Sequence, residues 1–406
     1  MRLPHTVLLT AAALATAIAA APASAATSPD RTLTSDLTRL AGGAGGRGGF
    51  VVLDGAGGKT LAASKPDRVA PLGSTAKLLT TGAALDALGP STALATEVVT
   101  AAGVTAGTLN GDLVLRGGGD PTLDEPQLAR LADAVQALGV TAISGSVVGD
   151  ETRFDALRGG PATSGAFDLE LQGSLGALTY ARGRQAPNGP LQPDPARAAA
   201  FRFDDVLEAR GIVVRGTPRA GATPPGAVVV GRVSTPITAV VKATNKVSDD
   251  FYAETLAKDL SAAAGTGPGS TAAGAALAAA HAKHLGATLS PVDGSGVDTR
   301  TRGSARQLAR YVRRMRTNAA FAASLPVAGV DGTLATRMTR GKAHRVCRAK
   351  TGSLPQTRVS ALAGWCRVGG RTLVFAILRD HVGSQAAAKA AEDAMVQRLA
   401  GGPAGR

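Results

Sequence analysis

Aromatic residues are scarce in this chain of 406 residues, which contains one tryptophan, three tyrosines and eight phenylalanines. Proteins that bind single-stranded nucleic acids stack the bases on aromatic side chains. Because no segment resembles a nucleic-acid-binding module either, we expect no nucleic-acid partner. Histidine is also rare, with five residues. His281 and His284 lie three apart on an expected helix, but a zinc site needs further ligands, so we predict neither a metal nor a cofactor.

Long hydrophobic runs are equally scarce, and the one pronounced run lies near the N-terminus. It extends from Val7 to Ala20, follows the positive charge of Arg2 and ends in Ala23-Ser24-Ala25. This small-x-small ending is the pattern that signal peptidase requires. The run is short for a membrane span, which needs about 20 apolar residues. We therefore expect residues 1–25 to be a secretory signal peptide and the mature protein to be exported without a transmembrane anchor.

The chain contains only two cysteines, Cys347 and Cys366. An even pair in an exported protein predicts a disulfide, and no cluster of histidines or acidic residues accompanies the pair to form a metal site. The strand that carries Cys347 should turn at residues 355–358 and return to Cys366. The two cysteines are then almost equidistant from the turn, and we expect them to face each other across a hairpin.

Acidic residues are fewer than basic ones: 30 against 44, which gives a net charge of +14. Much of the basic charge is arginine, alongside heavy use of alanine and glycine, and a high-GC genome explains this bias as well as a function does. A basic exported protein is nevertheless attracted to an anionic cell envelope.

Short strands, helices and Gly-Pro breaks divide the mature chain into interleaved parts. Residues 26–96 contain an expected hairpin and a long helix, and residues 236–402 contain several helices, three strands and a last helix. Residues 97–235 contain small strands and helices of their own. Because a hairpin near one end of a chain can pair with strands near the other end, we predict one discontinuous domain interrupted by an accessory insert over residues 97–235.

The tetrapeptide Ser74-Thr75-Ala76-Lys77 stands at the start of an expected helix that ends at Leu88. Serine and lysine three apart lie on one face of the first turn, where free backbone N–H groups and positive potential are found. Such a place suits a nucleophilic serine whose proton a nearby amine takes, and the potential disfavours the charged form of Lys77. Alone the motif is weak, because serine is also a favoured N-cap.

Two further motifs follow, each weak by itself. Ser248-Asp249-Asp250 opens an expected helix, in which Ser248 reads equally well as an N-cap followed by acidic residues. Lys350-Thr351-Gly352 lies on an expected strand, where the missing side chain of Gly352 lets a substrate backbone approach closely and its two neighbours can hold a carboxylate. In this order the three motifs match the signature of penicillin-binding proteins and class A β-lactamases, Ser-x-x-Lys, Ser-Asp-Asn and Lys-Thr-Gly.

The chain resembles the D-alanyl-D-alanine carboxypeptidase/endopeptidase family of the penicillin-binding protein 4 type, which comprises the low-molecular-mass class C penicillin-binding proteins. The long gap between the first two motifs is similar to the position of the family's inserted extra domains. The segments that carry the resemblance cover most of the mature chain: Gly73–Thr81, Arg116–Leu123, Asn245–Lys246, Tyr252–Leu256, Asp293–Gly296, Ser324–Gly329, Asp331–Leu334 and Ala349–Leu354.

The resemblance implies a transpeptidase-like, serine β-lactamase-like α/β fold with a mainly antiparallel sheet and helices on both faces. It also implies an activity: Ser74 attacks the carbonyl between two D-alanines of a peptidoglycan stem peptide and forms an acyl-enzyme, which water then hydrolyses. No cofactor is needed. β-Lactam antibiotics mimic the terminal dipeptide, so they are expected to acylate Ser74 as covalent inhibitors.

The resemblance assigns roles to the other motif residues as well. Lys77 is expected to be the base, and Ser248 to pass a proton to the leaving amine. Lys350 and Thr351 are expected to hold the terminal carboxylate. The backbone N–H groups of Ser74 and Ser353 are expected to form the oxyanion hole.

Asp250 departs from the family, which usually has asparagine at this position. Asparagine donates a hydrogen bond to a substrate carbonyl, whereas an ionised aspartate only accepts. A carboxylate beside Lys77 and Lys350 favours charged lysine, typically by about 1 to 3 pKa units, which predicts slow catalysis near neutral pH. A protonated Asp250 in a dry site would instead donate as asparagine does.

Two other functions stay open at this point. A non-catalytic penicillin-fold protein that binds wall peptides is favoured by Asp250. A β-lactamase or esterase of the same fold is disfavoured by the large insert, because β-lactamases keep the three motifs closer together. A fluorescent penicillin separates these functions, since a binder would not be labelled and a lactamase would turn the reagent over quickly.

Overall fold

The two ends of the chain meet in one five-stranded antiparallel sheet, in a computed structural model that describes residues 30–402. The strand order is β14-β15-β16-β1-β2. β1 (Arg47–Asp54) pairs along its whole length with β16 (Arg371–Asp380). β2 (Thr60–Ser64) closes one edge of the sheet and β14 (Cys347–Leu354) the other. The expected pairing of the early hairpin with the last strands is therefore found.

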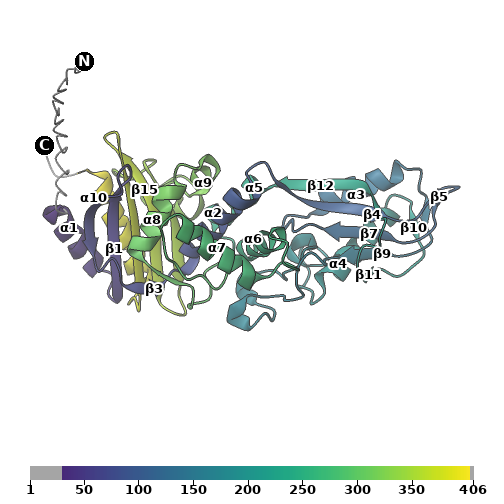
Figure 1. The fold of residues 1–406 in the computed structure, drawn as a ribbon, viewed down its shortest axis with the longest axis horizontal. Helices are drawn as coiled ribbons and strands as arrows, with labels where there is room; N and C mark the ends of the chain where they lie inside the picture. Colours follow the sequence, from purple (N-terminus) through teal and green to yellow (C-terminus); the bar gives the residue numbers. More distant parts are fainter. Residues whose placement is uncertain (1–29, 403–406) are drawn as a thin grey trace, which may run out of the picture.

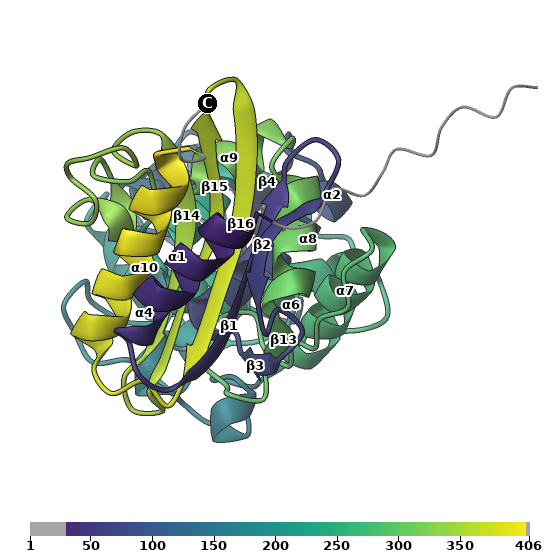
Figure 2. The same ribbon diagram turned by 90° about the vertical axis from the view of Figure 1, so that its left-hand side faces the viewer.

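Helices cover both faces of this sheet (Figure 2). α1 (Arg31–Gly42) and α10 (Gln385–Ala400) pack together on one face. α2 (Lys77–Leu88) and α8 (Ala305–Met315) pack on the other face. The mixed α/β fold that the resemblance implies, with an antiparallel sheet flanked by helices, is confirmed.

The run Phe50-Val51-Val52-Leu53 in β1 explains how one sheet supports two cores. Successive side chains of a strand point to opposite faces, so Phe50 and Val52 join the core beneath α1 and α10, whereas Val51 and Leu53 join the core beneath α2 and α8. All four residues are at most 3% exposed. A strand that is buried on both faces reads as an uninterrupted apolar run, and this made the strand predictable.

The hairpin of β14 and β15 (Val359–Val368) contains the two cysteines. Residues 355–358 form its turn, and Cys347 lies directly opposite Cys366 in the register of the two strands. The two residues form a disulfide with an S–S distance of 2.06 Å. The predicted disulfide and its position across a hairpin are confirmed, and the bridge joins the strand that carries Lys350 to the centre of the sheet.

The middle of the chain forms a second five-stranded sheet at the opposite end of the molecule (Figure 1). In this sheet β4 (Ala93–Thr100) pairs antiparallel with β12 (Val228–Pro236), and β7 (Leu113–Gly117) runs parallel to β9 (Val147–Asp150). A separate hydrophobic core lies between these strands and two helices, α3 and α4. The region therefore has sheets and a core of its own.

Shorter elements complete the fold. α4 begins at Pro195, where the side chain of Asp194 caps its N-terminus. The remaining bounds are α3 (Glu125–Gln136), α4 (Pro195–Glu208), α5 (Ile237–Val247), α6 (Asp250–Ala263), α7 (Thr271–His284), α9 (Ala319–Ser324), β3 (Val69–Pro71), β5 (Val104–Thr105), β6 (Thr108–Leu109), β8 (Ala142–Ile143), β10 (Val213–Val214), β11 (Arg219–Ala220) and β13 (Arg302–Ser304). There are also short 3-10 turns at Gly73–Ala76, Pro161–Thr163, Leu169–Leu171, Tyr180–Arg182 and Gly332–Leu334.

The N-terminal prediction concerns residues that the structure does not describe. The expected signal peptide, residues 1–25, lies outside the described range. Between residues 30 and 402, none of the helices combines the length and the apolar character that crossing a membrane would demand.

Replacing Cys347 and Cys366 together with serine should lower the free energy of unfolding by about 2 to 4 kcal/mol, because the bridge restricts the unfolded chain. Urea unfolding followed by circular dichroism measures the difference. Wild-type protein under reducing conditions is the control, and its unfolding midpoint should move to that of the double variant. An unchanged midpoint, or two free thiols in the unreduced protein, would contradict the assignment.

Candidate active site

The first motif lies where β3 leads into α2. Ser74 belongs to the 3-10 turn Gly73–Ala76, and α2 begins at Lys77. The sequence predicted one continuous helix from Ser74, so the prediction was correct about the place and wrong about the first turn. The Ser74 side chain stays accessible, at 8% exposure of the residue, whereas Lys77 is fully buried. Lys77 Nζ donates a hydrogen bond of 2.9 Å to Ser74 Oγ.

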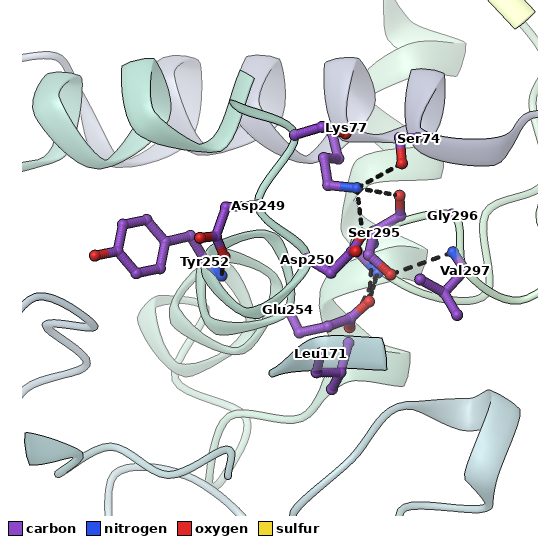
Figure 3. Close-up of polar contacts among 12 residues, drawn as sticks. Ser74, Lys77, Leu171, Asp249, Asp250, Tyr252, Glu254, Ser295, Gly296 and Val297 are labelled. Carbon is purple, nitrogen blue, oxygen red and sulfur yellow. Dashed lines mark hydrogen bonds and ion pairs between the residues drawn. The ribbon is translucent and has the colours of Figure 1, made fainter. Parts of the chain in front are cut away.

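The buried Lys77 amine contacts three acceptors from three parts of the chain (Figure 3). Besides Ser74 Oγ, Nζ lies 2.5 Å from Asp250 Oδ1 and 2.9 Å from the backbone oxygen of Ser295. An ammonium group has three N–H donors, and each of them has an acceptor here. The contact with Asp250 is an ion pair, and the Asp250 side chain is 24% exposed. These contacts hold the Lys77 amine beside the serine hydroxyl.

The second motif owes its shape to a tight junction between two helices. α5 ends at Val247, and its C-cap residue Ser248 has a φ of +66°, in the left-handed region. Asp249 is the N-cap of α6, with its carboxylate accepting from Tyr252 N at 2.9 Å. The alternative in which Ser248 is the N-cap is therefore wrong. Because the cap is provided by Asp249, the Ser248 hydroxyl is free to accept from Lys350 Nζ at 2.7 Å, and Asp250 in the first turn faces Lys77.

The third motif places a second buried lysine next to the first. Lys350 on β14 is 0% exposed, and its Nζ also contacts the backbone oxygen of Thr351 at 2.9 Å. Burial lowers the pKa of Lys350 well below its usual value of 10.5, and the positive charge of Lys77 adds to this, whereas the charge of Asp250 opposes it. Asp250 thus acts electrostatically on both lysines.

Gly352 also has a structural role that the sequence did not indicate. A Cβ atom on Gly352 would lie 2.9 Å from the backbone oxygen of Leu72 and 3.2 Å from the backbone nitrogen of Ser74. The missing side chain therefore lets β14 approach the turn that carries Ser74; the approach of a substrate to the same residue stays a prediction. A Cβ atom on Gly73 would in turn lie 3.6 Å from the backbone nitrogen of Ser353, so the backbone nitrogens of Ser74 and Ser353 border the same narrow gap.

A cleft of about 340 Å³ opens in front of these groups. Thr351 Oγ1 lies 2.9 Å from Thr333 Oγ1 at its wall. Thr333, Arg337 and Lys389 were not predicted as site residues; Thr333 lies in one of the segments that carry the resemblance, but no pattern assigned it a role. The residues that line the cleft are Ser74, Ser248, Thr333, Arg337, Thr351, Ser353 and Lys389.

Buried carboxyl groups behind Lys77 were also missed. The segment Asp293–Gly296 carries part of the resemblance but was assigned no role, yet the oxygen of Ser295 in this turn accepts from Lys77. Glu254, one helical turn after Asp250 on α6, accepts from the backbone nitrogens of Gly294 and Ser295. Burial and the nearby Asp293 carboxylate raise the pKa of Glu254 to about 7. Glu254 lies in the segment Tyr252–Leu256, which also carries the resemblance, and its spacing from Asp250, four apart on one helix face, is the further signal that could have indicated this.

No cluster of three or more histidine, cysteine, aspartate or glutamate side chains suited to a metal ion occurs in residues 30–402. His281, considered above as half of a metal pair, contacts Asp86 Oδ2 at 3.1 Å and the Tyr311 hydroxyl at 3.1 Å. Its ring is therefore engaged with protein groups.

The sequence profile of the D-Ala-D-Ala carboxypeptidase 3 (S13) family matches residues 33–166 and 163–401. The chain belongs to this family. A curated relative is the D-alanyl-D-alanine carboxypeptidase of Actinomadura sp. (strain R39). It is 28% identical over an alignment 440 residues long, gaps included, which covers 87% of this chain and 81% of the relative. The protein is thus a serine-type D-Ala-D-Ala carboxypeptidase by family.

Solved structures agree on the fold. Penicillin-binding protein 4 of Haemophilus influenzae superposes with a TM-score of 0.79 at 18% identity, covering 90% of this chain and 98% of that one. A penicillin G-acylated predatory endopeptidase of Bdellovibrio bacteriovorus, solved with its immunity protein, gives a TM-score of 0.57 at 16% identity, covering 86% and 90%. The resemblance inferred from the motifs is confirmed.

Gly352→Ala should displace the turn that carries Ser74, because the added methyl group collides with the backbone of Leu72. We expect kcat/KM on a D-Ala-D-Ala peptide to fall by about 10- to 100-fold, as misplaced reacting groups typically cause. Gly383→Ala is the matched control, since a Cβ at that position meets nothing within 4 Å. Full activity of Gly352→Ala would show that the close approach of β14 is unimportant.

Proposed function

We propose that the carboxypeptidase acts on peptidoglycan stem peptides through an acyl-enzyme on Ser74. The observation that carries the proposal is the 2.9 Å contact between Ser74 Oγ and Lys77 Nζ at the edge of the cleft. Ser74 Oγ bonds to the carbonyl carbon of the penultimate D-alanine, and the C–N bond to the terminal D-alanine breaks. Water then cleaves the ester, which releases the shortened peptide and restores the serine hydroxyl.

Two proton transfers accompany acylation. Lys77, once it has lost a proton, accepts the Ser74 proton, for which its position next to Oγ is suitable. Ser248 delivers a proton to the nitrogen of the leaving D-alanine. Its hydroxyl accepts from Lys350 Nζ at 2.7 Å, which leaves the hydroxyl hydrogen free to point at the leaving group. Asp250 keeps the Lys77 amine in place through the ion pair.

Residues of β14 bind the substrate carboxylate and help to stabilise the negative charge that develops on the attacked carbonyl oxygen. The terminal carboxylate of the substrate is held by Thr351 Oγ1 at the cleft wall and by the buried amine of Lys350 behind it. The backbone N–H groups of Ser74 and Ser353 donate to the oxygen that becomes negative when the carbonyl carbon is attacked. Their closeness follows from the two glycines, Gly73 and Gly352, whose Cβ positions would lie next to these nitrogens.

Several broader assignments accompany this mechanism. β-Lactams acylate the same serine and inhibit the enzyme. The first 25 residues direct export, and the enzyme works outside the cytoplasm on the cell wall. Residues 26–96 and 236–402 constitute the catalytic domain, with residues 97–235 as its accessory domain; the sheet of that region runs from Ala93 to Pro236, which supports a boundary close to this division.

The ion pair between Lys77 and Asp250 favours one alternative, a weakly active or non-catalytic protein that binds wall peptides. A base must be neutral to take a proton, and a carboxylate 2.5 Å away stabilises the ammonium form instead. A β-lactamase or esterase is the third candidate, and rapid release of the acyl group from Ser74 would identify it.

Benzylpenicillin should form a stable adduct on the peptide that contains Ser74, detectable by mass spectrometry after proteolysis. Ser74→Ala removes the nucleophile and should abolish labelling, whereas Ser384→Ala, an exposed helix cap far along the chain, should leave labelling intact. An adduct on another residue, or undiminished labelling of Ser74→Ala, would refute Ser74 as the nucleophile. Absence of any adduct in the wild-type protein would favour the non-catalytic binder.

Asp250→Asn should accelerate acylation at neutral pH by about tenfold or more, because it removes the charge that stabilises the Lys77 ammonium. The same change should raise KM for D-Ala-D-Ala peptides as pH increases, since Asp250 opposes the lowering of the Lys350 pKa and its loss makes Lys350 neutral at lower pH. Rates and KM are measured from pH 6 to pH 10. Identical profiles for both proteins would place Asp250 outside the working site.

A further inference from the structure

The turn Asp293–Gly296 is bonded from both sides by the helices that carry the catalytic lysine and its partner carboxylate (Figure 3). From α2, Lys77 Nζ donates to the oxygen of Ser295 at 2.9 Å, and Thr80 Oγ1 donates to the oxygen of Gly294 at 2.7 Å. From α6, Glu254 Oε1 accepts from Gly294 N at 3.0 Å and from Ser295 N at 2.8 Å. The position of the turn therefore depends on the Glu254 carboxyl group.

A single peptide unit then connects one of the buried acids, Asp293, to the lysine. The nitrogen of Gly296 donates to Asp293 Oδ1 at 3.0 Å, and the carbonyl of the same peptide, on Ser295, accepts from Lys77. A carboxylate at one end of a peptide group strengthens the hydrogen bond at its other end, because hydrogen bonds in a chain polarise one another. The negative charge of this turn is thus directed at the Lys77 amine.

The two buried acids of this turn region, Glu254 and Asp293, have no cationic side chain in direct contact among the described residues. Glu254 and Asp293 are 1% and 2% exposed, and neither forms an ion pair with any residue between 30 and 402. The charged groups around them are Lys77 on α2, Asp250 and Lys258 on α6, and Asp298 and Arg300, which follow the turn. Lys258 is itself paired with Asp155 at 2.5 Å, and Arg300 with Asp298 at 2.5 Å. Asp293 has more donors, including Asp298 N and Thr301 Oγ1, and these hydrogen bonds, with the charge of Lys77, oppose the burial that raises its pKa.

We propose that Glu254 is a positioning residue for the Lys77 base, and that its gain or loss of a proton sets how firmly the turn holds Lys77 as an ammonium ion. The inference rests on the proposed role of Lys77 in acylation. It assigns a role in the family activity to a second carboxyl group, which lies outside the three catalytic motifs. Glu254 acts through the turn Asp293–Gly296, without contact with the substrate.

The pH dependence follows from the raised pKa of Glu254, about 7. Below this value Glu254 is neutral and only Asp293 and Asp250 act on Lys77. Above it a further negative charge appears one helical turn from Asp250, which favours the Lys77 ammonium and slows acylation relative to an enzyme without that charge. Ionised Glu254 therefore opposes the rise in rate that deprotonation of Lys77 produces at alkaline pH.

Glu254→Gln tests this, because the amide keeps an oxygen to accept from Ser295 N and removes the charge. Acylation by a fluorescent penicillin, followed by stopped flow from pH 5.5 to 9, should give equal rates for both proteins at pH 5.5. At pH 8 the variant should be about threefold to tenfold faster. Parallel profiles, or a variant that is equally impaired at every pH, would overturn the proposal in favour of a purely structural role.

Asp259→Asn is the matched control. Asp259 lies on the same helix, is fully buried and has a pKa that burial raises well above its usual value, but its ion-pair partner is Arg153 in the inserted region, at 3.5 Å. Its replacement should leave the shape of the pH profile unchanged. A control profile that changes in the same way as that of Glu254→Gln would show a general effect of buried charge and contradict the specific role of Glu254.

If Glu254→Gln does not fold, carbon-13 NMR of the wild-type protein with labelled glutamate carboxyls replaces it. One glutamate should titrate near pH 7, and its midpoint should move when penicillin acylates Ser74 and alters the contacts of Lys77. Unchanged midpoints on acylation would overturn the proposal. Failure of the wild-type protein to react with penicillin at any pH would instead count against the proposed function, so the two failures are distinguishable.

Discussion

The ammonium group of Lys77 is the point on which the rest of the site depends. Its three donors are taken by Ser74 Oγ, Asp250 Oδ1 and the oxygen of Ser295, and these acceptors come from the turn before α2, from the first turn of α6 and from the loop after α7. A fully buried amine is stable only with such partners, because an unpaired buried charge is costly. The fold therefore has to bring three distant segments to one nitrogen atom, and the same contacts hold the nucleophile.

Asp250 changes the electrostatics of a site that usually has asparagine at this position. Two buried lysines, Lys77 and Lys350, face each other with Asp250 as their shared counter-charge. The carboxylate gives the buried Lys77 amine a partner of opposite charge, and it opposes the lowering of the Lys350 pKa that burial and Lys77 cause. An asparagine at this position would remove that negative charge from the surroundings of both lysines.

Much of this arrangement could be predicted from local sequence. The apolar run Phe50–Leu53 indicated a central strand, and the spacing of Cys347 and Cys366 about a short turn indicated the bridged hairpin, because both depend on near neighbours in the chain. The left-handed Ser248 could not be predicted, since asparagine and glycine are the usual residues there and the reason lies in its contact with Lys350. The structural role of Gly352 could not be predicted, because its missing side chain accommodates the backbone of Leu72 and Ser74, far away in the sequence. Glu254 and Thr333 were missed because only tertiary packing places them at the site.

A crystal structure of the enzyme, free and after reaction with benzylpenicillin, tests the central claim most directly. The account predicts that Lys77 Nζ of the free enzyme contacts Ser74 Oγ, Asp250 and the Ser295 oxygen. After the reaction, the penicilloyl group should be bonded to Ser74 Oγ with its carbonyl oxygen at the backbone N–H groups of Ser74 and Ser353. A free enzyme in which Lys77 is withdrawn from Asp250 and Ser295, or a penicilloyl group on any other residue, would contradict it.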